Sequence, residues 1–305
     1  MNIGNFYTLH GKIETEALSV VVSQFCPKSA AAWDEIDDNI GQILARMDQA
    51  SAGFPGFDLF VSPECAFQGY HAGKWSQFLL DLDGPRVQRV KDKCKELNVW
   101  GIFNPWIKPK DGRFCDNTGI IVNPEGEIVH KYVKMNPWTP GEPTQAGSAC
   151  PVLMDGPKGA KIGLIICADG DYPEIWREAA VNGANIIVRI SHYMAPFDRA
   201  MSITNKAGAY CNQVYVVSCN TAGIDEYYNY FGESAIYNPD GTEIVQAPTG
   251  IPYVIKADLY PGIIDAMRKQ AVHANPMYTY KNRGASNPDD NGFGISEMPY
   301  NAYKY

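Results

Sequence analysis

The sequence lacks the residue spacings that mark disulfide scaffolds and metal sites. Its eight cysteines include no CxxC pair, and its five histidines form neither an HxH nor an HxxxH motif. A chain of 305 residues is far larger than a disulfide scaffold, so we interpret the cysteines as free thiols of a reducing cytoplasm. Without paired ligand residues, we expect no built-in metal.

Long apolar runs and an excess of basic charge are also missing. No apolar stretch approaches the roughly 18 residues of a membrane-spanning helix, and the first residues lack the basic and apolar segments of a signal peptide. The net charge of −8 argues against nucleic acid or an anionic membrane surface as a partner. Because 45% of the residues are hydrophobic, a sizeable core is available. These features predict a soluble, cytoplasmic, globular protein.

Strand and helix patterns alternate along the chain, which indicates an α/β fold. Two series of three strands share this alternation. The first has predicted strands at 18–25, 57–61 and 98–103 and helices at 33–52 and 85–97. The second has predicted strands at 162–167, 184–190 and 214–219, a helix that begins at Pro173, and a helix at 198–212.

A hairpin is predicted after each series. The runs TGIIVNPEGEIV (118–129) and SAIYNPDGTEIV (234–245) both place Asn-Pro-x-Gly between two strands. Proline at the second turn position and glycine at the fourth are typical of a type I turn with a bulge. The repeated order predicts two similar halves merged into one domain.

The sequence becomes less regular after Asp258. A helix is predicted near 261–272, followed by a tail rich in Asn, Pro, Gly and Tyr. We therefore divide the chain into a domain at 1–260 and a C-terminal helix and tail at 261–305. We expect this extension to pack on the domain or on a neighbouring subunit of a homo-oligomer, a dimer or a dimer-based assembly.

The stretch KIGLIICADGDYPEIWR (161–177) places a cysteine at a strand–helix junction. Cys167 ends an apolar run, and Pro173 opens the helix that follows. Backbone N–H groups and the helix dipole at such a junction favour a thiolate and a developing oxyanion. A lone cysteine in an apolar run is more often simply buried, so a catalytic role needs partners elsewhere.

Candidate partners follow other predicted strands. Glu64 comes after the second strand, and the C-terminal ends of strands form the edge where α/β sheets bind ligands. Lys134 follows the first hairpin, and a lysine there can stabilise an oxyanion. His192 lies at the end of the strand after Cys167 and is another candidate base. Each of these residues alone is more often a structural or solvated side chain.

A series of motifs runs in order from about residue 18 to about residue 260. They are Pro63-Glu64 with Gln68-Gly69, Lys131-Tyr132-Val133-Lys134 with Pro137-Trp138, Glu142, Cys167-Ala168-Asp169-Gly170 with Pro173-Glu174, Arg189-Ile190-Ser191 with Tyr193, and Tyr230-Phe231-Gly232-Glu233. This series resembles the nitrilase superfamily, and within it the aliphatic amidase and formamidase branch. The resemblance implies a four-layer α-β-β-α sandwich.

The resemblance also implies the roles of the site residues. Glu64 would be the general base, Lys134 the oxyanion stabiliser, Cys167 the nucleophile, and Glu142 a second carboxylate that positions the substrate. The backbone N–H of Ala168 would be a second oxyanion donor. The implied reaction converts an amide into a carboxylic acid and ammonia through a thioester, without metal or organic cofactor. His192 is then no longer needed as a base.

Departures from the family pattern bear on the substrate. Nitrilases tend to carry tryptophan where this chain has Ala168, which disfavours a nitrile. Carbamoyl-amino-acid hydrolases carry arginines where this chain has Gly170 and Asp171, which cannot clamp a carboxylate. Formamidases and aliphatic amidases carry tyrosine and histidine where this chain has Cys65 and Ala168. We therefore expect a small neutral aliphatic amide and a pocket roomier or less polar than one built for formamide.

Five residues are candidates for substrate binding. Trp138 is implied by the resemblance, His192 and Tyr193 follow from their strand-end position, and Cys65 and Ala168 follow from the departures above. Three readings remain open beside the amidase. They are an N-carbamoyl or ω-amide hydrolase, a nitrilase of the same superfamily, and a non-catalytic thiol scaffold or redox sensor that uses Cys167.

Overall fold

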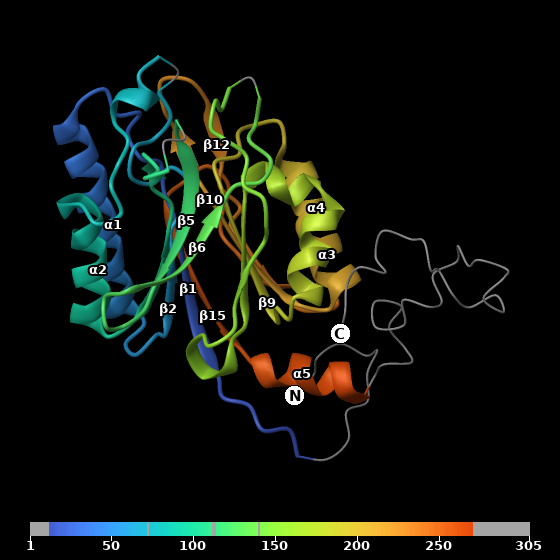
Figure 1. Cartoon of the computed structure of the whole chain (residues 1–305). Helices are drawn as coiled ribbons and strands as arrows, with labels where there is room; N and C mark the ends of the chain where they lie inside the picture. Colours follow the sequence, from blue (N-terminus) through green and yellow to red (C-terminus); the bar gives the residue numbers. More distant parts are fainter. Residues whose placement is uncertain (1–11, 72, 112–113, 140, 271–305) are drawn as a thin grey trace, which may run out of the picture.

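The computed structural model describes residues 12–71, 73–111, 114–139 and 141–270. Two β-sheets lie face to face, and helices cover the outer face of each sheet (Figure 1). Helices α1 (Trp33–Gly53) and α2 (Pro85–Leu97) cover one sheet, and α3 (Pro173–Val181) and α4 (Asp198–Asn212) cover the other. This is the four-layer α-β-β-α sandwich that the sequence predicted.

The first sheet has the strand order β15-β1-β2-β3-β5-β4, with β6 paired to β5. Its strands are β1 (Leu18–Gln24), β2 (Leu59–Val61), β3 (Trp100–Phe103), β4 (Trp106–Ile107), β5 (Asp116–Val122), β6 (Ile128–Val133) and β15 (Tyr253–Leu259). Strands β1, β2 and β3 are parallel, and β5 and β6 follow as an antiparallel hairpin.

The second sheet has the order β14-β13-β10-β9-β8-β7. Its strands are β7 (Val152–Leu153), β8 (Ile162–Ile166), β9 (Ile186–Ser191), β10 (Tyr215–Asn220), β13 (Ala235–Tyr237) and β14 (Glu243–Gln246). Strands β8, β9 and β10 are parallel, and β13 and β14 follow as an antiparallel hairpin. The topology repeats that of the first sheet, in agreement with the two similar halves that the sequence predicted.

The two hairpins turn as their sequences predict. The Gly126 N–H donates to the Asn123 carbonyl at 3.0 Å, and the Gly241 N–H donates to the Asn238 carbonyl at 2.9 Å. Both glycines have a positive φ, 79° and 81°, which residues with a side chain rarely adopt. The pairing register shifts beside each turn, as a bulge requires.

Residues of β1 alternate between two parts of the core. Val20 and Val22 belong to the cluster that fills the space between the sheets, whereas Val21 belongs to the cluster under α1 and α2. Both faces of the strand are therefore buried. Burial on both faces explains why the sequences of the central strands are continuous apolar runs. The helices supply one apolar face each, such as Ile36 and Ile40 of α1.

The sequence analysis missed β15, which pairs antiparallel with β1 along its full length. Buried Ile255, Ala257 and Leu259 alternate with more exposed polar residues in this strand, so it lacks a continuous apolar run. Several short elements were also missed. They are β4, β7, the small ribbon of β11 (Ala222–Ile224) and β12 (Asn229–Phe231), and the 3-10 helices η1 (Trp75–Gln77), η2 (Pro157–Gly159) and η3 (Cys167–Asp171).

Helix α5 (Pro261–Gln270) follows β15. Its residues Ile263, Ile264 and Met267 are buried and belong to the larger core cluster, which also includes residues of α3 and α4. The last two positions of the predicted helix at 261–272, and the tail after it, lie outside the described residues. The boundary at 260 and the role of the tail therefore stay predictions.

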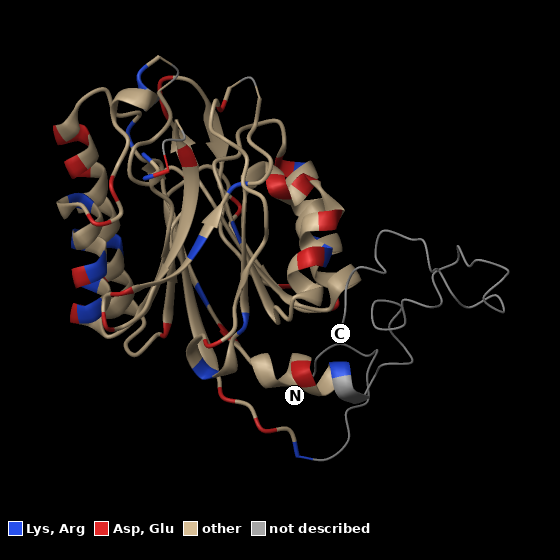
Figure 2. Cartoon of the chain, viewed as in Figure 1, with Lys and Arg blue, Asp and Glu red and all other residues tan. Residues whose placement is uncertain are grey.

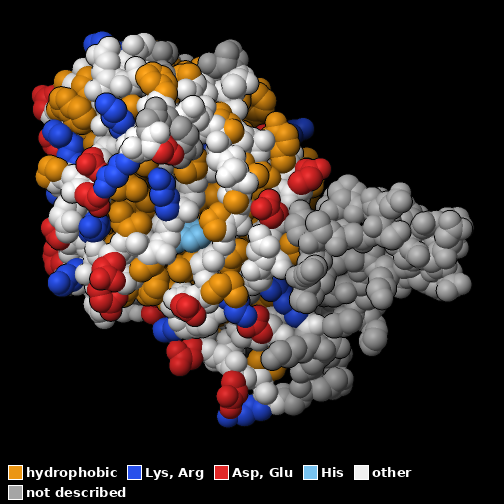
Figure 3. All heavy atoms as spheres, in the orientation of Figure 1, with side chains coloured by type: hydrophobic (Ala, Val, Ile, Leu, Met, Phe, Trp, Pro, Cys, Tyr) orange, Lys and Arg blue, Asp and Glu red, His pale blue; other side chains and the backbone are white. Residues whose placement is uncertain are grey.

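Charged side chains lie mainly on the helices and loops that surround the sheets (Figure 2). On the face shown in Figure 3, acidic and basic side chains are interspersed with apolar ones. Within the described ranges, none of the helices combines the length and apolar character needed to cross a bilayer.

Candidate active site

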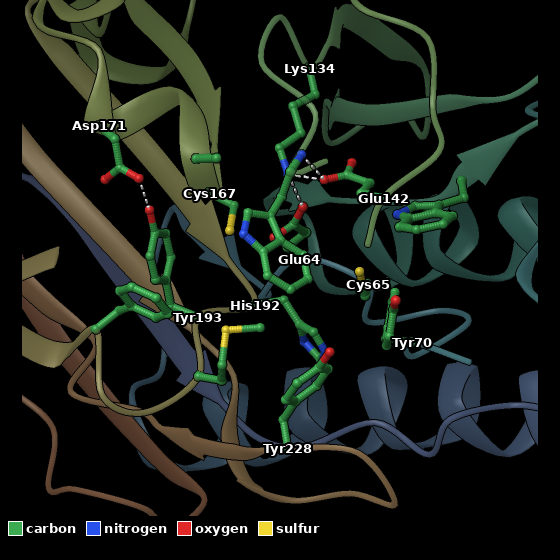
Figure 4. A pocket seen from close by; sticks show the side chains of 15 residues that line it. Glu64, Cys65, Tyr70, Lys134, Glu142, Cys167, Asp171, His192, Tyr193 and Tyr228 are labelled. Carbon is green, nitrogen blue, oxygen red and sulfur yellow. Dashed lines mark hydrogen bonds and ion pairs between the residues drawn. The ribbon is translucent and has the colours of Figure 1, made fainter. Parts of the chain in front are cut away.

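Cys167 occupies a tight bend between β8 and α3. It has a φ of 51°, in the left-handed region, and it begins the 3-10 helix η3. The wholly buried Arg189 guanidinium donates to the Cys167 carbonyl through Nε at 3.0 Å and Nη2 at 2.8 Å. These two bonds hold the bend in place and leave the sulfur directed away from the strand, among the residues shown in Figure 4.

Asp169 ties this bend to the segment that carries Lys134. Its Oδ2 accepts hydrogen bonds from the Ile166 N–H at 3.0 Å and the Tyr132 hydroxyl at 2.6 Å. Its Oδ1 accepts from the Asn136 N–H at 2.8 Å. Tyr132 and Asn136 flank Lys134 in the chain, so the buried Asp169 carboxylate sets the nucleophile and the lysine in register with each other.

Lys134 lies between two carboxylates. Its Nζ is 3.0 Å from Glu64 Oε1 and 2.5 Å from Glu142 Oε2. Asn117 Nδ2 bridges the same carboxylates, donating to Glu64 Oε1 at 2.8 Å and to Glu142 Oε1 at 2.6 Å. Within the described part of the chain, Glu64 Oε2 has no hydrogen-bond partner. One oxygen of Glu64 is thus held in place and the other is available.

A second set of hydrogen bonds orients this cluster. Asn104 donates to Asn117 Oδ1 at 2.7 Å and accepts from the Cys65 N–H at 2.8 Å. The Trp138 N–H donates to Glu142 Oε2 at 3.0 Å. The sequence analysis missed Asn104 and Asn117, because single asparagines at strand ends have no pattern that separates an anchor from a turn residue.

Burial and ion pairing set the protonation of the cluster. Burial raises the pKa of Glu64, although Lys134 opposes this effect. Burial by itself would raise the pKa of Glu142 too, but its pairing with Lys134 lowers that pKa overall. Burial would lower the pKa of Lys134, yet the charges of Glu142 and Glu64 hold it well above its usual value. The cluster thus favours a charged Lys134 and a charged Glu142, whereas burial favours the protonated form of Glu64.

Cys167 is a thiol at rest rather than a thiolate. Burial raises its pKa well above the usual value, and the charge of Glu64 adds to this effect. The sequence analysis expected the helix N-terminus to favour a thiolate, and burial opposes that effect in the resting site. A nucleophilic attack by this sulfur needs a base that takes the proton as the reaction proceeds.

A cavity of about 100 Å³ lies beside the sulfur (Figure 4). Every site residue named from the sequence lines it. These residues are Glu64, Lys134, Glu142, Cys167, Cys65, Trp138, Ala168, His192 and Tyr193. The sequence analysis did not propose the other lining residues. These are Tyr70, Trp106, Asp171, Met194, Phe197 and Tyr228, most of which come from loops without a regular pattern.

Aromatic rings form much of the cavity wall and its rim. Tyr228 contacts Tyr70 with ring centroids 5.9 Å apart and Trp138 with centroids 6.4 Å apart. Trp138 and Phe197 are 37% and 45% exposed, so the cavity opens to the surface beside them. Among the described lining residues, Lys134 is the one cationic side chain, and two carboxylates already pair with it.

Comparisons with known proteins agree with this architecture. The pattern of the carbon-nitrogen hydrolase family matches residues 20–269. A formamidase of Bacillus thuringiensis (strain Al Hakam) is 38% identical over 273 residues, which cover 88% of this chain and 81% of the relative. A formamidase of Bacillus cereus (strain AH820) shows the same identity and coverage.

Solved structures show the same fold at lower identity. Nit3 of Saccharomyces cerevisiae, a member of branch 10 of the nitrilase superfamily, aligns with a TM-score of 0.75 and 23% identity over 85% of this chain and 96% of its own. An amidase from Nesterenkonia sp. aligns with a TM-score of 0.73 and 18% identity over 86% of this chain and 97% of its own.

The fold and the family pattern together define an enzyme that hydrolyses carbon–nitrogen bonds of amides. The chain belongs to the carbon-nitrogen hydrolase family, in the formamidase- and amidase-like branch of the nitrilase superfamily. The family, the fold class and the enzyme class predicted from the sequence are confirmed.

Proposed function

We propose that this enzyme converts a small neutral aliphatic amide into a carboxylic acid and ammonia through a thioester on Cys167. The observation that supports this most is a buried cysteine at a strand–helix bend that shares one cavity with Glu64, Lys134 and Glu142. The formamidases of 38% identity add support for an amide substrate.

In the first half of the reaction, Glu64 Oε2 takes the thiol proton while the Cys167 sulfur attacks the amide carbonyl carbon. The carbonyl oxygen becomes an oxyanion, which the Lys134 ammonium and the Ala168 backbone N–H stabilise. Ala168 lies in the first turn of η3, where backbone N–H groups have no partner within the helix. The protonated Glu64 then gives its proton to the leaving nitrogen, so ammonia departs and a thioester remains.

In the second half, Glu64 takes a proton from water, and the resulting hydroxide attacks the thioester carbonyl. The same two donors hold the second oxyanion. When it collapses, the carbon–sulfur bond breaks, the sulfur regains the proton from Glu64, and the carboxylic acid leaves. Glu142 accepts hydrogen bonds from Lys134 and Asn117, so we assign it to positioning the lysine and the amide nitrogen.

The size and charge of the cavity support a small neutral substrate. An apolar cavity of about 150 Å³ holds benzene, which has six heavy atoms, so 100 Å³ corresponds to about four heavy atoms. Longer acyl groups would extend toward the open end at Trp138. The one lining cation is already paired with two carboxylates, so a substrate carboxylate would meet no free positive charge.

Mass spectrometry and ammonia release test this proposal. After incubation with formamide, acetamide, propionamide or butyramide, intact-mass analysis should show the corresponding acyl adduct on Cys167, and ammonia should be released. Cys167→Ala should lose both signals. Cys211→Ala is the matched control, since Cys211 is exposed and remote from the cavity lining, and it should keep both. Unchanged ammonia release by Cys167→Ala would refute the mechanism.

The same measurements, extended to an N-carbamoyl compound and a nitrile, separate the alternatives. Carbon dioxide released with the ammonia would indicate a carbamoyl substrate, and hydrolysis of a nitrile in place of an amide would indicate a nitrilase. A thiol scaffold would react with iodoacetamide at Cys167 yet release no ammonia. The cytoplasmic location and the homo-oligomer, a dimer or a dimer-based assembly, stay predictions. Light scattering on the purified full chain measures the oligomer.

A further inference from the structure

His192 is a buried side chain in the cavity wall that the mechanism above does not use. It follows β9 directly, is 7% exposed and lines the cavity, where Figure 4 labels it. Its backbone N–H opposes the rise in the pKa of the Cys167 thiol. The residue therefore lies near Cys167 in the wall of the same cavity.

Two contacts fix the ring before any substrate arrives. Nδ1 is 2.6 Å from Thr221 Oγ1. The ring also packs on Tyr230, with centroids 4.0 Å apart, and the Tyr230 hydroxyl is in turn held by Asp225 at 2.9 Å. A ring that is held on one edge and one face loses little freedom when it binds a ligand, so it can discriminate between ligands.

The surroundings of Thr221 assign the tautomer of the ring. The Thr221 hydroxyl has one proton and two acceptors within reach, His192 Nδ1 at 2.6 Å and the Ser191 carbonyl at 3.5 Å. The Ser191 carbonyl already accepts the Thr221 backbone N–H at 3.1 Å. We therefore assign the hydroxyl proton to the shorter bond with Nδ1, which leaves the ring proton on Nε2.

That Nε2–H group has no hydrogen-bond partner within the described ranges of the chain. A buried donor without an acceptor is costly, so a substrate group that reaches Nε2 and accepts its hydrogen bond gains over one that does not. His192 thus gives the cavity wall a buried N–H donor that lacks a hydrogen-bond acceptor.

The acceptor must belong to the acyl group of the substrate. In the proposed mechanism the carbonyl oxygen faces Lys134 and Ala168, and the amide nitrogen is itself a donor that suits the carboxylates. Burial lowers the pKa of His192 to about 3, so the ring is neutral near pH 7 and offers no charge to an anionic substituent. A neutral ether, keto or hydroxyl oxygen fits these conditions.

We propose that His192 Nε2–H is a specificity-determining donor, which selects amides whose acyl group carries a neutral hydrogen-bond acceptor near the carbonyl. This inference rests on the proposed amidase function and narrows its substrate class. The test compares methoxyacetamide with butyramide, because the two differ by one ether oxygen in place of a methylene. The wild-type enzyme should favour methoxyacetamide in kcat/KM.

The ratio of the two kcat/KM values should fall at least about tenfold in His192→Phe, which can keep the packing on Tyr230 but has no N–H group. Comparing ratios between variants removes the difference in intrinsic reactivity of the two amides. Thr221→Val, which releases the ring and its tautomer, should lower the ratio in the same direction. His71→Phe is the matched control, since His71 does not line the cavity, and its ratio should equal that of the wild type.

The outcomes separate this inference from the proposed function. A ratio unchanged in both His192→Phe and Thr221→Val overturns the inference but does not contradict the amidase function. If His192→Phe does not fold, Thr221→Val decides. If the wild-type enzyme releases ammonia from neither amide, nor from the shorter series above, the proposed function fails and the inference fails with it.

Discussion

Asn117 offers a sharp test of how the charged cluster works, because one side-chain amide donates to both carboxylates. In Asn117→Leu the side chain keeps a similar size, so little cavity forms, but the donor is gone. Each lost hydrogen bond to a charged group is worth about 1.5–3 kcal/mol. The bonds of 2.8 Å to Glu64 and 2.6 Å to Glu142 are both buried, and solvent cannot replace them.

The expected result is a shift of the pH profile as well as a loss of rate. A donor to a carboxylate favours its charged form, so removing it makes Glu64 harder to ionise and raises its pKa further. Since 1.36 kcal/mol corresponds to one pH unit, the acidic limb of kcat/KM should move upward by about one to two pH units. At a pH below the new limb the rate should fall about tenfold per pH unit.

The assay is ammonia release from the best amide of the series between pH 5 and pH 9. Asn182→Leu is the matched control, because its side-chain amide lies at the end of α3 and only reaches the Cys150 carbonyl at 3.5 Å. In that variant the acidic limb of the kcat/KM profile should lie at the same pH as in the wild type. If the limb of a folded Asn117→Leu coincides with the wild-type one, Glu64 is not the group that titrates, and the assignment of the base is wrong.

Three further predictions follow from the same contacts. A methyl group on Gly170 would lie 2.1 Å from the guanidinium carbon of Arg189, so Gly170→Ala should displace that anchor and lower kcat at least about tenfold, whereas Gly53→Ala, with open space around it, should not. Alkylation of Cys167 by iodoacetamide should still accelerate above pH 9, since burial raises its pKa, and peptide mass analysis follows it. In Lys134→Met the two carboxylates lose their cation, so the folded state takes up a proton that the unfolded state lacks. As the pH rises from 6 to 8, the free energy of unfolding of this variant should then fall by up to about 1.4 kcal/mol per pH unit. Urea denaturation measures this change, and the wild type should change less.

The residues that we propose for the chemistry could be named from the sequence because each follows a strand with a clear pattern. Cys167 comes directly after β8, Lys134 after β6, and Glu64 after β2. The ends of strands are predictable from periodicity, and the side chains just beyond them share an edge of the fold. The family resemblance then selected these residues from many candidates with the same local pattern.

The rest of the site depends on contacts between segments that are distant in the chain. Asn104 can donate to Asn117 only because β3 and β5 are neighbours in the sheet. The Tyr228 ring, from the second half, contacts the Tyr70 ring of the first half. No local pattern marks such residues. The same holds for the Cys167 thiol, because its protonation is set by burial and by Glu64, neither of which is visible in the surrounding sequence.

The position of the site follows from the duplication. The first half supplies Glu64, Lys134 and Glu142, and the second half supplies Cys167 and His192, so the groups that we propose to react meet where the two sheets pack. The packing is close: a methyl group on Gly119 of β5 would lie 2.5 Å from the side chain of Leu164 in β8. Well-packed interiors deform little, so the distance between base and nucleophile is fixed by the core between the sheets rather than by the loops that bear them. The loops of the cavity wall are then free to differ, so the specificity that we propose for His192 could change without disturbing the chemistry.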